Sequence, residues 1–417
     1  MVHGRATDDH FPTSGRGRKP GSPASCQGRH RESCRFEWSV GAGGDPAELV
    51  AAFLSGNGLP VRDMGRTANQ FHPTGEGTPC GAALYVSASA GSVMAGGPPG
   101  APSPVPGIPD VVAVVHRHAA PTEPSLSVMG ACANGGGEWR LGPFSDSWSR
   151  AEHAAAVTAV RAAIARGDVY QVNVVGHASA PYTGDPGPAL ARVAGLPGAR
   201  YGGVLSGAGW AIATASPETL VEVRGGRIIT RPIKGTRPAT ARGRRELLAS
   251  AKERAEHVMI VDLERNDLAR LGVGPVRVDE LFAVRRWCGL WQAESVVSAP
   301  IERPVGLAEL LRALCPGGSV TGAPKRAALE VIARLEPVGR GVAMGALGWV
   351  GTDHVDLGLS IRTAAVDGER VHLWAGGGIT IDSDPEAEVD EAAAKAAPMR
   401  AALAGRPMSP TARPGTA

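Results

Sequence analysis

The carboxylates of residues 382–400, DSDPEAEVDEAAAKAAPMR, are the residues whose types and spacing most clearly suggest chemistry. The segment is helical in pattern, so Glu388 and Glu391, three residues apart, share one face, with Lys395 four residues further on. Such a pair could hold a hard cation such as Mg²⁺, which takes one or two carboxylates together with substrate oxygens. An ordinary solvated face with a Glu–Lys pair explains the same spacing.

A second acidic helix is predicted at residues 252–271, KERAEHVMIVDLERNDLARL. Its apolar residues occur nearly all round, so we expect it to be largely buried. Glu256 then lies beside a buried run, where an unpaired carboxylate is costly, and a metal ion or a basic partner would remove that cost. Pairing with Arg254 or Lys252 is an equally simple alternative. His257 is expected to be structural, because no second ligand stands four residues away.

Two glycine-rich runs could bring backbone amides close to an anion. CPGGSVTGAPKR, 315–326, resembles a phosphate loop, but Ala323 and Pro324 stand where such a loop needs lysine and a hydroxyl residue. We therefore exclude a nucleotide triphosphatase and expect a glycine-rich turn before a helix. WAGGGIT, 374–380, is expected to follow a strand and to offer amides to a ligand. Arg362, within the apolar run SIRTAAV, is expected in a strand, pairing with an acid or binding an anion.

Lys234 stands in RPIKGTRP, 231–238, at the end of a strand-like run. Taken alone, it is either an exposed lysine at a strand end or a nucleophile held in a pocket. Three acids, an arginine, two glycine runs and this lysine point to a Mg²⁺-dependent enzyme acting on a small polycarboxylate.

The elements that must position these residues alternate in type. Strands are predicted by hydrophobic pattern, some of them linked as hairpins, at 110–116, 211–215, 219–223, 227–231, 337–349, 357–366 and 371–374. Helices are predicted at Ser149–Arg166, which ends at Gly167, and at 382–400, where Asp384 suits the N-cap, Pro385 the first turn and Pro398 the end. Hairpin-linked strands with helices inserted between groups favour an α+β fold with antiparallel sheets.

Composition narrows the function classes. Of 417 residues, 43% are hydrophobic and 20% charged, and the net charge of +3 argues against a dedicated nucleic-acid binder. No apolar run approaches the roughly 20 residues of a membrane span. The six cysteines lack paired spacing, which favours free thiols in a reducing cytosol over disulfides or a zinc site. Residues 1–36 and the tail 405–417 are poor in apolar positions and are predicted to be disordered.

Several blocks together resemble the chorismate-utilising enzymes, which include component I of anthranilate synthase and of aminodeoxychorismate synthase and the isochorismate and salicylate synthases. The resemblance covers about residues 150–400 in collinear order. The blocks are GDVYQVNV (167–174), ASPETLVEV (215–223), TRPIKGTRPAT (230–240), AEHVMIVDLERNDLARL (255–271), PGGSVTGAPKRAALEVIARLEP (316–337), IRT (361–363) and GGGITIDSDPEAEVDEAAAKA (376–396).

The resemblance implies two antiparallel sheets packed face to face with helices outside and chorismate bound between them. It divides the chain into a shortened amino-terminal subdomain, 37–148, and a chorismate-binding catalytic domain, 149–404. By residue-by-residue correspondence, it implies three classes of site residue. Glu256, Glu388 and Glu391 would bind Mg²⁺; Gln171, Gly235, Thr236, Thr321, Arg362, Gly376, Gly377, Gly378 and Lys395 would contact the substrate; and Glu218 would be the general acid and Lys234 the nucleophile.

Two positions indicate the product within the family. Gln171 stands where isochorismate and salicylate synthases carry a lysine base, and glutamine cannot deprotonate water. Lys234, in PIKGT, resembles aminodeoxychorismate synthases, whereas anthranilate synthases resemble PIAGT. The resemblance therefore implies amination of chorismate at C4, in the cytoplasm, for 4-aminobenzoate and folate or a specialised metabolite.

Departures from the family pattern keep alternatives open. WQAES, 291–295, has Gln292 where histidine is usual and Glu294 where an apolar residue is usual, and Ala343 replaces an aromatic. These changes leave open an anthranilate or 2-amino-2-deoxyisochorismate synthase, or a weakly active chorismate-binding subunit that regulates a partner. No glutaminase segment is recognisable, so ammonia would be free or would come from a separate glutamine amidotransferase subunit.

Overall fold

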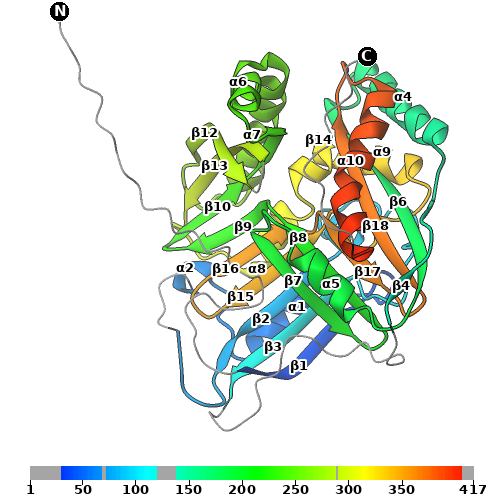
Figure 1. Ribbon diagram of the computed structural model, residues 1–417. Helices are drawn as coiled ribbons and strands as arrows, with labels where there is room; N and C mark the ends of the chain where they lie inside the picture. Colours follow the sequence, from blue (N-terminus) through cyan, green and yellow to red (C-terminus); the bar gives the residue numbers. More distant parts are fainter. Residues whose placement is uncertain (1–29, 68–71, 120–137, 288–289, 406–417) are drawn as a thin grey trace, which may run out of the picture.

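The computed structural model describes residues 30–67, 72–119, 138–287 and 290–405, and its strands form two antiparallel sheets (Figure 1). The ten-stranded sheet contains, in spatial order, β1 (His30–Trp38), β3 (Val111–His118), β2 (Pro79–Val86), β15 (Ala346–Gly351), β16 (Val355–Leu359), β9 (Thr219–Arg224), β10 (Arg227–Arg231), β13 (Leu290–Pro300) and β11 (Ile233–Pro238), and β12 (Arg277–Trp287) also pairs with β13. The eight-stranded sheet contains β14 (Gly322–Ala323), β6 (Gln171–Thr183), β18 (Arg370–Ile379), β17 (Thr363–Val366), β8 (Trp210–Ser216) and β7 (Tyr201–Gly207), with β4 (Arg140–Leu141) and β5 (Ser145–Asp146) beside β6.

The two sheets pack against each other through alternate residues of their strands. In β8, Trp210 and Ile212 belong to the largest apolar cluster, which also contains Val221 and Leu357 of the other sheet. The alanines between them face the opposite side and join a second cluster beneath α5 (Gly187–Ala194). This period of two is what a strand buried on both faces requires. The predicted α+β fold of two facing antiparallel sheets is confirmed.

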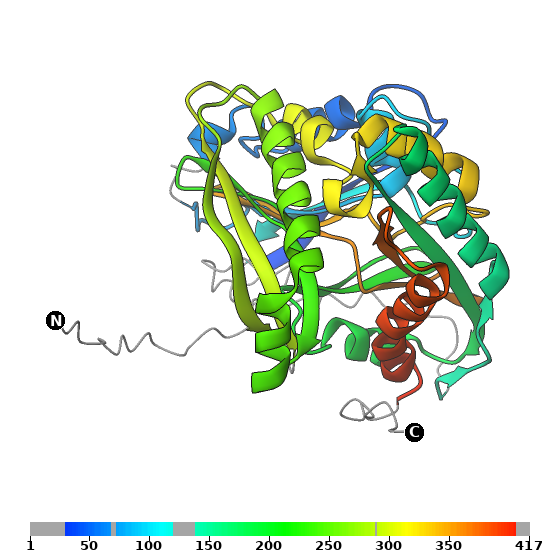
Figure 2. The same cartoon turned by 90° about the horizontal axis from the view of Figure 1, so that it is seen from above.

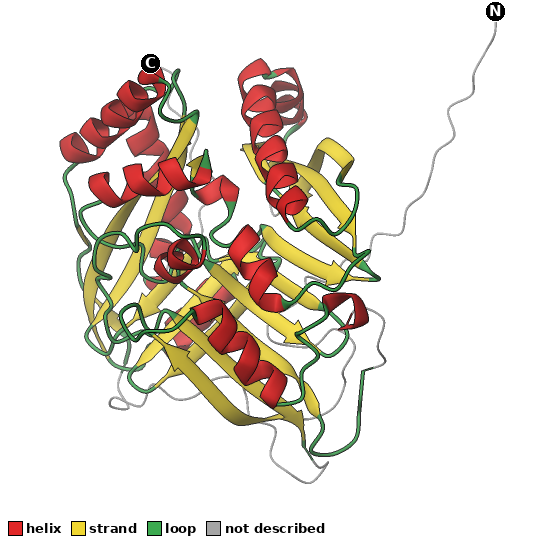
Figure 3. Ribbon diagram, turned by 180° about the vertical axis from the view of Figure 1, so that it is seen from behind, coloured by secondary structure: helices red, strands yellow, loops and turns green. Residues whose placement is uncertain are grey.

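Helices lie mainly on the outer faces of the sheets (Figure 3). α4 (Arg150–Arg166) begins in a capping box between Ser149 and Glu152 and ends at Gly167 in a left-handed conformation, as predicted. The other helices are α1 (Pro46–Gly56), α2 (Met64–Thr67), α3 (Ala88–Met94), α6 (Ala241–Ala249), α7 (Ala251–Arg270), α8 (Leu307–Leu314), the 3₁₀ turn η1 (Gly318–Val320), α9 (Lys325–Leu335) and α10 (Pro385–Leu403).

Two helices carry the acidic residues of interest. α7 packs on β11, β12 and β13, whereas α10 packs on β18 and α4, so each helix is supported by a different sheet (Figures 1 and 2). α10 continues past Pro398, where we expected it to end. Met399 and Leu403 are buried in the cluster under α5, and that packing outweighs the missing backbone donor.

The amino-terminal prediction is wrong for residues 30–36, which belong to strand β1 rather than to a disordered extension. The strand pairs with β3 through its backbone, which a composition argument based on side chains does not detect. Residues 1–29 and 406–417, for which disorder is also predicted, lie outside the described residues. β2 pairs with β15, so the segment 37–148 shares a sheet with the rest of the chain.

Two long strand predictions are also corrected. Of 337–349, only the end enters β15, because the preceding residues form turns that bring Arg340 against Glu336 in a buried ion pair. The run 357–366 is divided between β16 and β17, which belong to different sheets. Within the described ranges, no helix has the length and apolar character needed to cross a membrane.

Candidate active site

Two neighbouring connections in which the chain passes from one sheet to the other each carry a predicted site residue. Glu218 lies between β8 and β9, and Arg362 lies between β16 and β17. The two connections are hydrogen-bonded to adjoining strand ends: Leu359 N donates to Glu218 O at 3.1 Å, and Ala215 N donates to Arg362 O at 3.1 Å. The acid and the guanidinium are therefore held on one structural unit.

Arg362 is not in the middle of a strand, as we predicted, but in a tight connection where its φ is +50°. This left-handed conformation is uncommon for a side chain other than glycine. The chain needs it here because it leaves one sheet and enters the other within three residues. Residues held in such conformations are often found at functional sites.

Glu218 has the environment of a general acid. Its side chain is buried, and Ser319 Oγ donates a hydrogen bond to Oε1 at 2.8 Å. Burial raises the pKa of Glu218, although the Ser319 hydrogen bond and the nearby Lys234 oppose the rise. A carboxyl group with a raised pKa is better suited than an ordinary one to donate a proton to a leaving group.

Lys234 lies on β11, at a bulge where Gly235 takes a φ of +76°. Its Nζ would lie 3.4 Å from a Cβ placed on Gly378 of the opposite sheet. Among the described residues, no hydrogen bond or ion pair is found for this amine. Burial lowers the pKa of Lys234, although Glu218 opposes the change. The amine therefore points between the sheets with a larger neutral fraction than an exposed lysine has.

The glycine run 376–378 lies inside strand β18, not after a strand as predicted. It pairs with β6 throughout, whereas β17 pairs with β18 only up to Leu373, so the described residues leave the other edge of the run without a strand partner. A Cβ on Gly378 would lie 1.9 Å from Gln171 Nε2, and one on Gly377 would lie 3.0 Å from Glu388 Oε2. The glycines are thus required because site side chains occupy the space that a Cβ would fill.

Gln171 begins β6 and is almost fully buried, with its Oε1 lacking a hydrogen-bond partner among the described residues. Asn173, two residues on, is also buried and has the same deficit at Oδ1. Sequence reasoning missed Asn173, although its spacing from Gln171 places both on one face of the strand. Buried amide oxygens that lack a hydrogen-bond partner among the described residues, next to the glycine run of β18, are available to a polar ligand.

Three predicted contacts have structural roles in this state of the protein. Gly235 packs against α6 and α7, where a Cβ would lie 2.7 Å from Leu247 Cδ1. Thr321 Oγ1 donates to Gly317 O at 2.8 Å and so closes the turn before α9. Thr236 is exposed, and its Oγ1 accepts from Gln292 Nε2 at 3.5 Å.

The three predicted metal ligands lie on α7 and α10. Ser383 Oγ donates to Glu388 Oε1 at 2.7 Å, whereas Glu391 forms an ion pair with Lys395 at 2.6 Å. Lys395 Nζ also donates to Gly376 O at 2.9 Å. Within the described part of the chain, the three carboxylates do not lie at donor distance as one set. The Glu–Lys pair that we kept as an alternative is therefore present.

Two of these carboxylates fit a divalent cation. Burial raises the pKa of Glu256, and Glu253 and Glu388 add to the rise against Lys234 and Lys252. Burial also raises the pKa of Glu388, and Glu391 adds to it. Glu256 is half-buried and Glu388 is buried, and carboxylates that repel one another in such surroundings are stabilised when a cation binds. Oxygen donors suit Mg²⁺. The predicted alternative partner of Glu256 is present but distant, with Lys252 Nζ 3.9 Å away.

The sequence analysis did not identify a buried group of charged residues close to Glu218. Lys325 pairs with Asp267 at 2.7 Å, and both side chains are almost fully buried. Glu264, one turn earlier on α7, accepts from Thr230 Oγ1 at 3.3 Å. Burial and the Asp267 charge raise the pKa of Glu264 to about 8. The polar face DLERND of an otherwise apolar helix was the signal for this group. His257, as predicted, is structural: its Nε2 shares a hydrogen bond of 2.5 Å with Ser295 Oγ.

The unusual acid Glu294 is fully accommodated. It is buried, and it pairs with Arg200 at 2.8 Å and with Arg285 at 3.1 Å. Two guanidinium groups compensate the cost of burying its charge. This departure from the family pattern is therefore a local structural replacement and leaves Glu218 and Lys234 in place.

A buried acid, an amine for which the described residues show no partner, and two carboxylates with raised pKa on facing helices together suggest an enzyme site for a small polar substrate. The chain belongs to the chorismate binding enzyme family, whose model matches residues 119–401.

Its relatives divide between two activities. It is 41% identical over 256 residues to anthranilate synthase component 1 of Streptomyces coelicolor, covering 59% of this chain and 50% of the relative. It is 38% identical over 256 residues to aminodeoxychorismate synthase component 1 of Salmonella typhimurium, with 60% and 56% covered. The corresponding enzyme of Bacillus subtilis is 36% identical over 273 residues, with 63% and 57% covered. The matched region spans about half the length of these relatives.

Solved structures show the same fold. Anthranilate synthase component I from Streptococcus pneumoniae superposes with a TM-score of 0.70 at 23% identity, covering 93% of this chain and 95% of that one. The menaquinone-specific isochorismate synthase from Escherichia coli superposes with a TM-score of 0.60 at 16% identity, covering 91% and 96%. The two-sheet architecture is therefore common to enzymes with different products.

Proposed function

We propose that this chain is component I of an aminodeoxychorismate synthase, which converts chorismate and ammonia to 4-amino-4-deoxychorismate. The observation that carries the proposal is the amine of Lys234, which lies between the sheets with no ion partner among the described residues and a lowered pKa. A lysine in this state is suited to nucleophilic attack, and Glu218 lies near enough to influence its charge.

The chain's own residues account for each proton and bond. Lys234 Nζ forms a bond to C2 of chorismate while the C4 hydroxyl leaves as water with a proton from Glu218. Ammonia then forms a bond to C4, the C2–N bond breaks, and the C4 ammonium returns a proton to Glu218. Arg362 and the free edge of β18 are the proposed anchor for one substrate carboxylate.

Bound Mg²⁺ would supply positive charge for the other substrate carboxylate. Glu256 and Glu388 are its proposed ligands, with Glu391 joining through water after release from Lys395. Gln171 and Asn173 would donate or accept hydrogen bonds to the substrate's polar groups.

Anthranilate synthesis is the second candidate, because one of the relatives reported above at similar identity has that activity. It would use the same acid and cation, with ammonia adding at C2 instead of C4. The proposed ammonia source in either case is a separate glutamine amidotransferase subunit, since the relatives are named as components of larger enzymes. One of the two departures that motivated the regulatory-subunit alternative is accounted for, because Glu294 pairs with two arginines.

One assay separates these candidates. The purified chain is incubated with chorismate, Mg²⁺ and ammonium, with and without an aminodeoxychorismate lyase. We expect 4-aminobenzoate only when lyase is present, whereas anthranilate fluorescence without lyase would support the second candidate. The absence of any product would support the regulatory alternative.

Lys234→Ala tests the covalent role. It should abolish the 4-aminobenzoate signal, whereas Arg242→Ala, a matched loss of an exposed cation, should not change it. Equal activity of Lys234→Ala and the parent chain would show that the lysine is not the nucleophile.

A further inference from the structure

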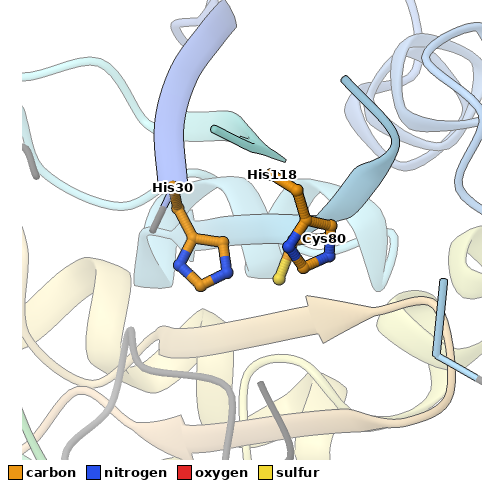
Figure 4. Close-up of side chains that lie close together, drawn as sticks. All are labelled: His30, Cys80 and His118. Carbon is orange, nitrogen blue, oxygen red and sulfur yellow. The ribbon is translucent and has the colours of Figure 1, made fainter. Parts of the chain in front are cut away.

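A cluster of nitrogen and sulfur ligands lies at one end of the ten-stranded sheet, in a part of the chain that the proposed reaction does not use. In the order β1, β3, β2, His30 and His118 are direct cross-strand partners. Cys80 lies in the adjacent strand at a bulge between Pro79 and Gly81. Figure 4 shows the three side chains close together, with Cys80 beside the His118 ring.

The donor atoms are close enough to share one ion. One ligand atom from each of His30, Cys80 and His118 lies within 4.8 Å of the others. Cys80 and His118 are buried, with 0% and 4% of their surfaces exposed, and His30 is half-buried. The imidazoles of His30 and His118 have ring centroids 5.0 Å apart. A hydrogen bond between a cysteine and a histidine needs only two side chains, whereas three lie together here.

A candidate fourth ligand, His72, lies in the segment before β2, outside the group of three residues whose donor atoms all lie within 4.8 Å of one another. His72 Nε2 lies 3.7 Å from Cys80 Sγ, and its ring is 5.2 Å from that of His118. For a tetrahedral zinc ion with Zn–S of about 2.3 Å and Zn–N of about 2.05 Å, the S···N edge is roughly 3.6 Å. The observed distance between these two atoms is therefore that of two ligands on one zinc ion.

The orientation of the His72 ring is also fixed by contacts at its other nitrogen, Nδ1. Its Nδ1 lies 3.0 Å from Thr352 Oγ1 and 3.8 Å from Asp353 Oδ1, while its Nε2 faces the sulfur. A carboxylate or hydroxyl on the far nitrogen of a histidine is the usual support of a zinc ligand. Asp353 itself is held by His354 at 2.7 Å.

We propose that His30, Cys80 and His118 bind one zinc ion, and that His72 moves closer as the fourth ligand to complete a tetrahedral site. The site joins the start of β1, the end of β3 and the bulge of β2 to the segment before β2, so its role is to stabilise the amino-terminal strands. It is independent of the proposed reaction, because none of its ligands belongs to the active site.

The first test uses the full-length chain, purified without a histidine tag. After dialysis against excess Zn²⁺ and removal of loosely bound metal, elemental analysis should find about one zinc per chain. Replacement by Co²⁺ should give the visible bands of tetrahedral cobalt and a thiolate-to-cobalt charge-transfer band. A folded chain that retains no metal and gives no cobalt spectrum would overturn the proposal.

Variants identify the ligands. Cys80→Ser should lose the charge-transfer band, whereas Cys34→Ser, a change at another thiol of this sheet, should keep it. Asp353→Asn should weaken zinc affinity about 10- to 100-fold while leaving the stoichiometry and the spectrum unchanged. Cobalt binding by Cys80→Ser with an unaltered spectrum would show that the metal lies elsewhere and that the assignment is wrong.

Discussion

Gly378→Ala is the substitution whose effect the structure defines most sharply. An added Cβ would lie 1.9 Å from Gln171 Nε2, 3.1 Å from its Cδ and 3.4 Å from Lys234 Nζ. Ordinary contact begins at 3.4 Å, so the Gln171 amide would have to move by roughly 1.5 Å. Because Gln171 is 1% exposed, that movement takes place inside a packed region.

Two effects of different size follow from this displacement. Overpacking of a buried site typically costs about 1–3 kcal/mol of unfolding free energy. The activity should suffer more, because a misplacement of about 1 Å near a reacting group can reduce rate about 100-fold. The predicted signature is therefore a large fall in kcat/KM with a moderate fall in Tm.

The assay combines thermal unfolding with the coupled 4-aminobenzoate assay. Gly56→Ala is the matched control, since its Cβ would meet nothing within 4 Å. It should leave both kcat/KM and Tm close to those of the parent. The double variant Gly378→Ala, Gln171→Ala removes the clashing amide, so its loss of stability should be smaller than the sum of the single losses by about 0.5–3 kcal/mol.

Two results would refute this reasoning. A Gly378→Ala variant with unchanged activity would show that the space next to Lys234 is not used. Additive losses in the double variant would show that Gln171 is not the group displaced.

Three further predictions concern charged groups in and below the site. Burial raises the pKa of Glu218 and lowers that of Lys234, so kcat/KM should show a bell-shaped pH profile, and a flat profile would contradict their roles. The pKa of Glu264 is raised to about 8, so the stability that it contributes is complete at low pH and is lost as pH rises through that value. Glu264→Gln should therefore raise Tm relative to the parent at about pH 9 and not at about pH 5, and the reverse order would refute the assignment. Lys325→Ala breaks a buried ion pair and should lower the free energy of unfolding, measured with denaturant, by about 3–5 kcal/mol. Arg326→Ala, at an exposed pair, should lower it by less than about 1 kcal/mol. Equal losses would be inconsistent with a buried Lys325–Asp267 pair.

Sequence patterns predicted the layers of this fold better than the boundaries within it. Alternation correctly identified the hairpin of β9 and β10, because each strand lies within a single sheet. It could not show that the run 357–366 is divided between two sheets at Arg362. Both halves are apolar, and only their strand partners assign them to different sheets. It also placed the glycine run 376–378 after a strand, because it did not include the backbone pairing with β6.

The active-site residues were recognisable because they lie in long collinear blocks, but the buried support was not. Asp267 and Lys325 are 58 residues apart and look like surface charges in the sequence, yet their side chains meet at 2.7 Å. The same limit applies to His30, His72, Cys80 and His118. The sequence analysis disfavoured a zinc site because the six cysteines lack paired spacing, and the strand order is what brings His30, Cys80 and His118 together.

The two connections that carry Glu218 and Arg362 also affect how the protein unfolds. The chain crosses between the sheets at both of them, and their backbone hydrogen bonds link adjoining strand ends. The strand ends around the two connections should therefore behave as one cooperative unit in hydrogen exchange. The acid and the guanidinium then keep their relative positions until the whole unit opens, whereas the outer strands can fray at the edges without disturbing them.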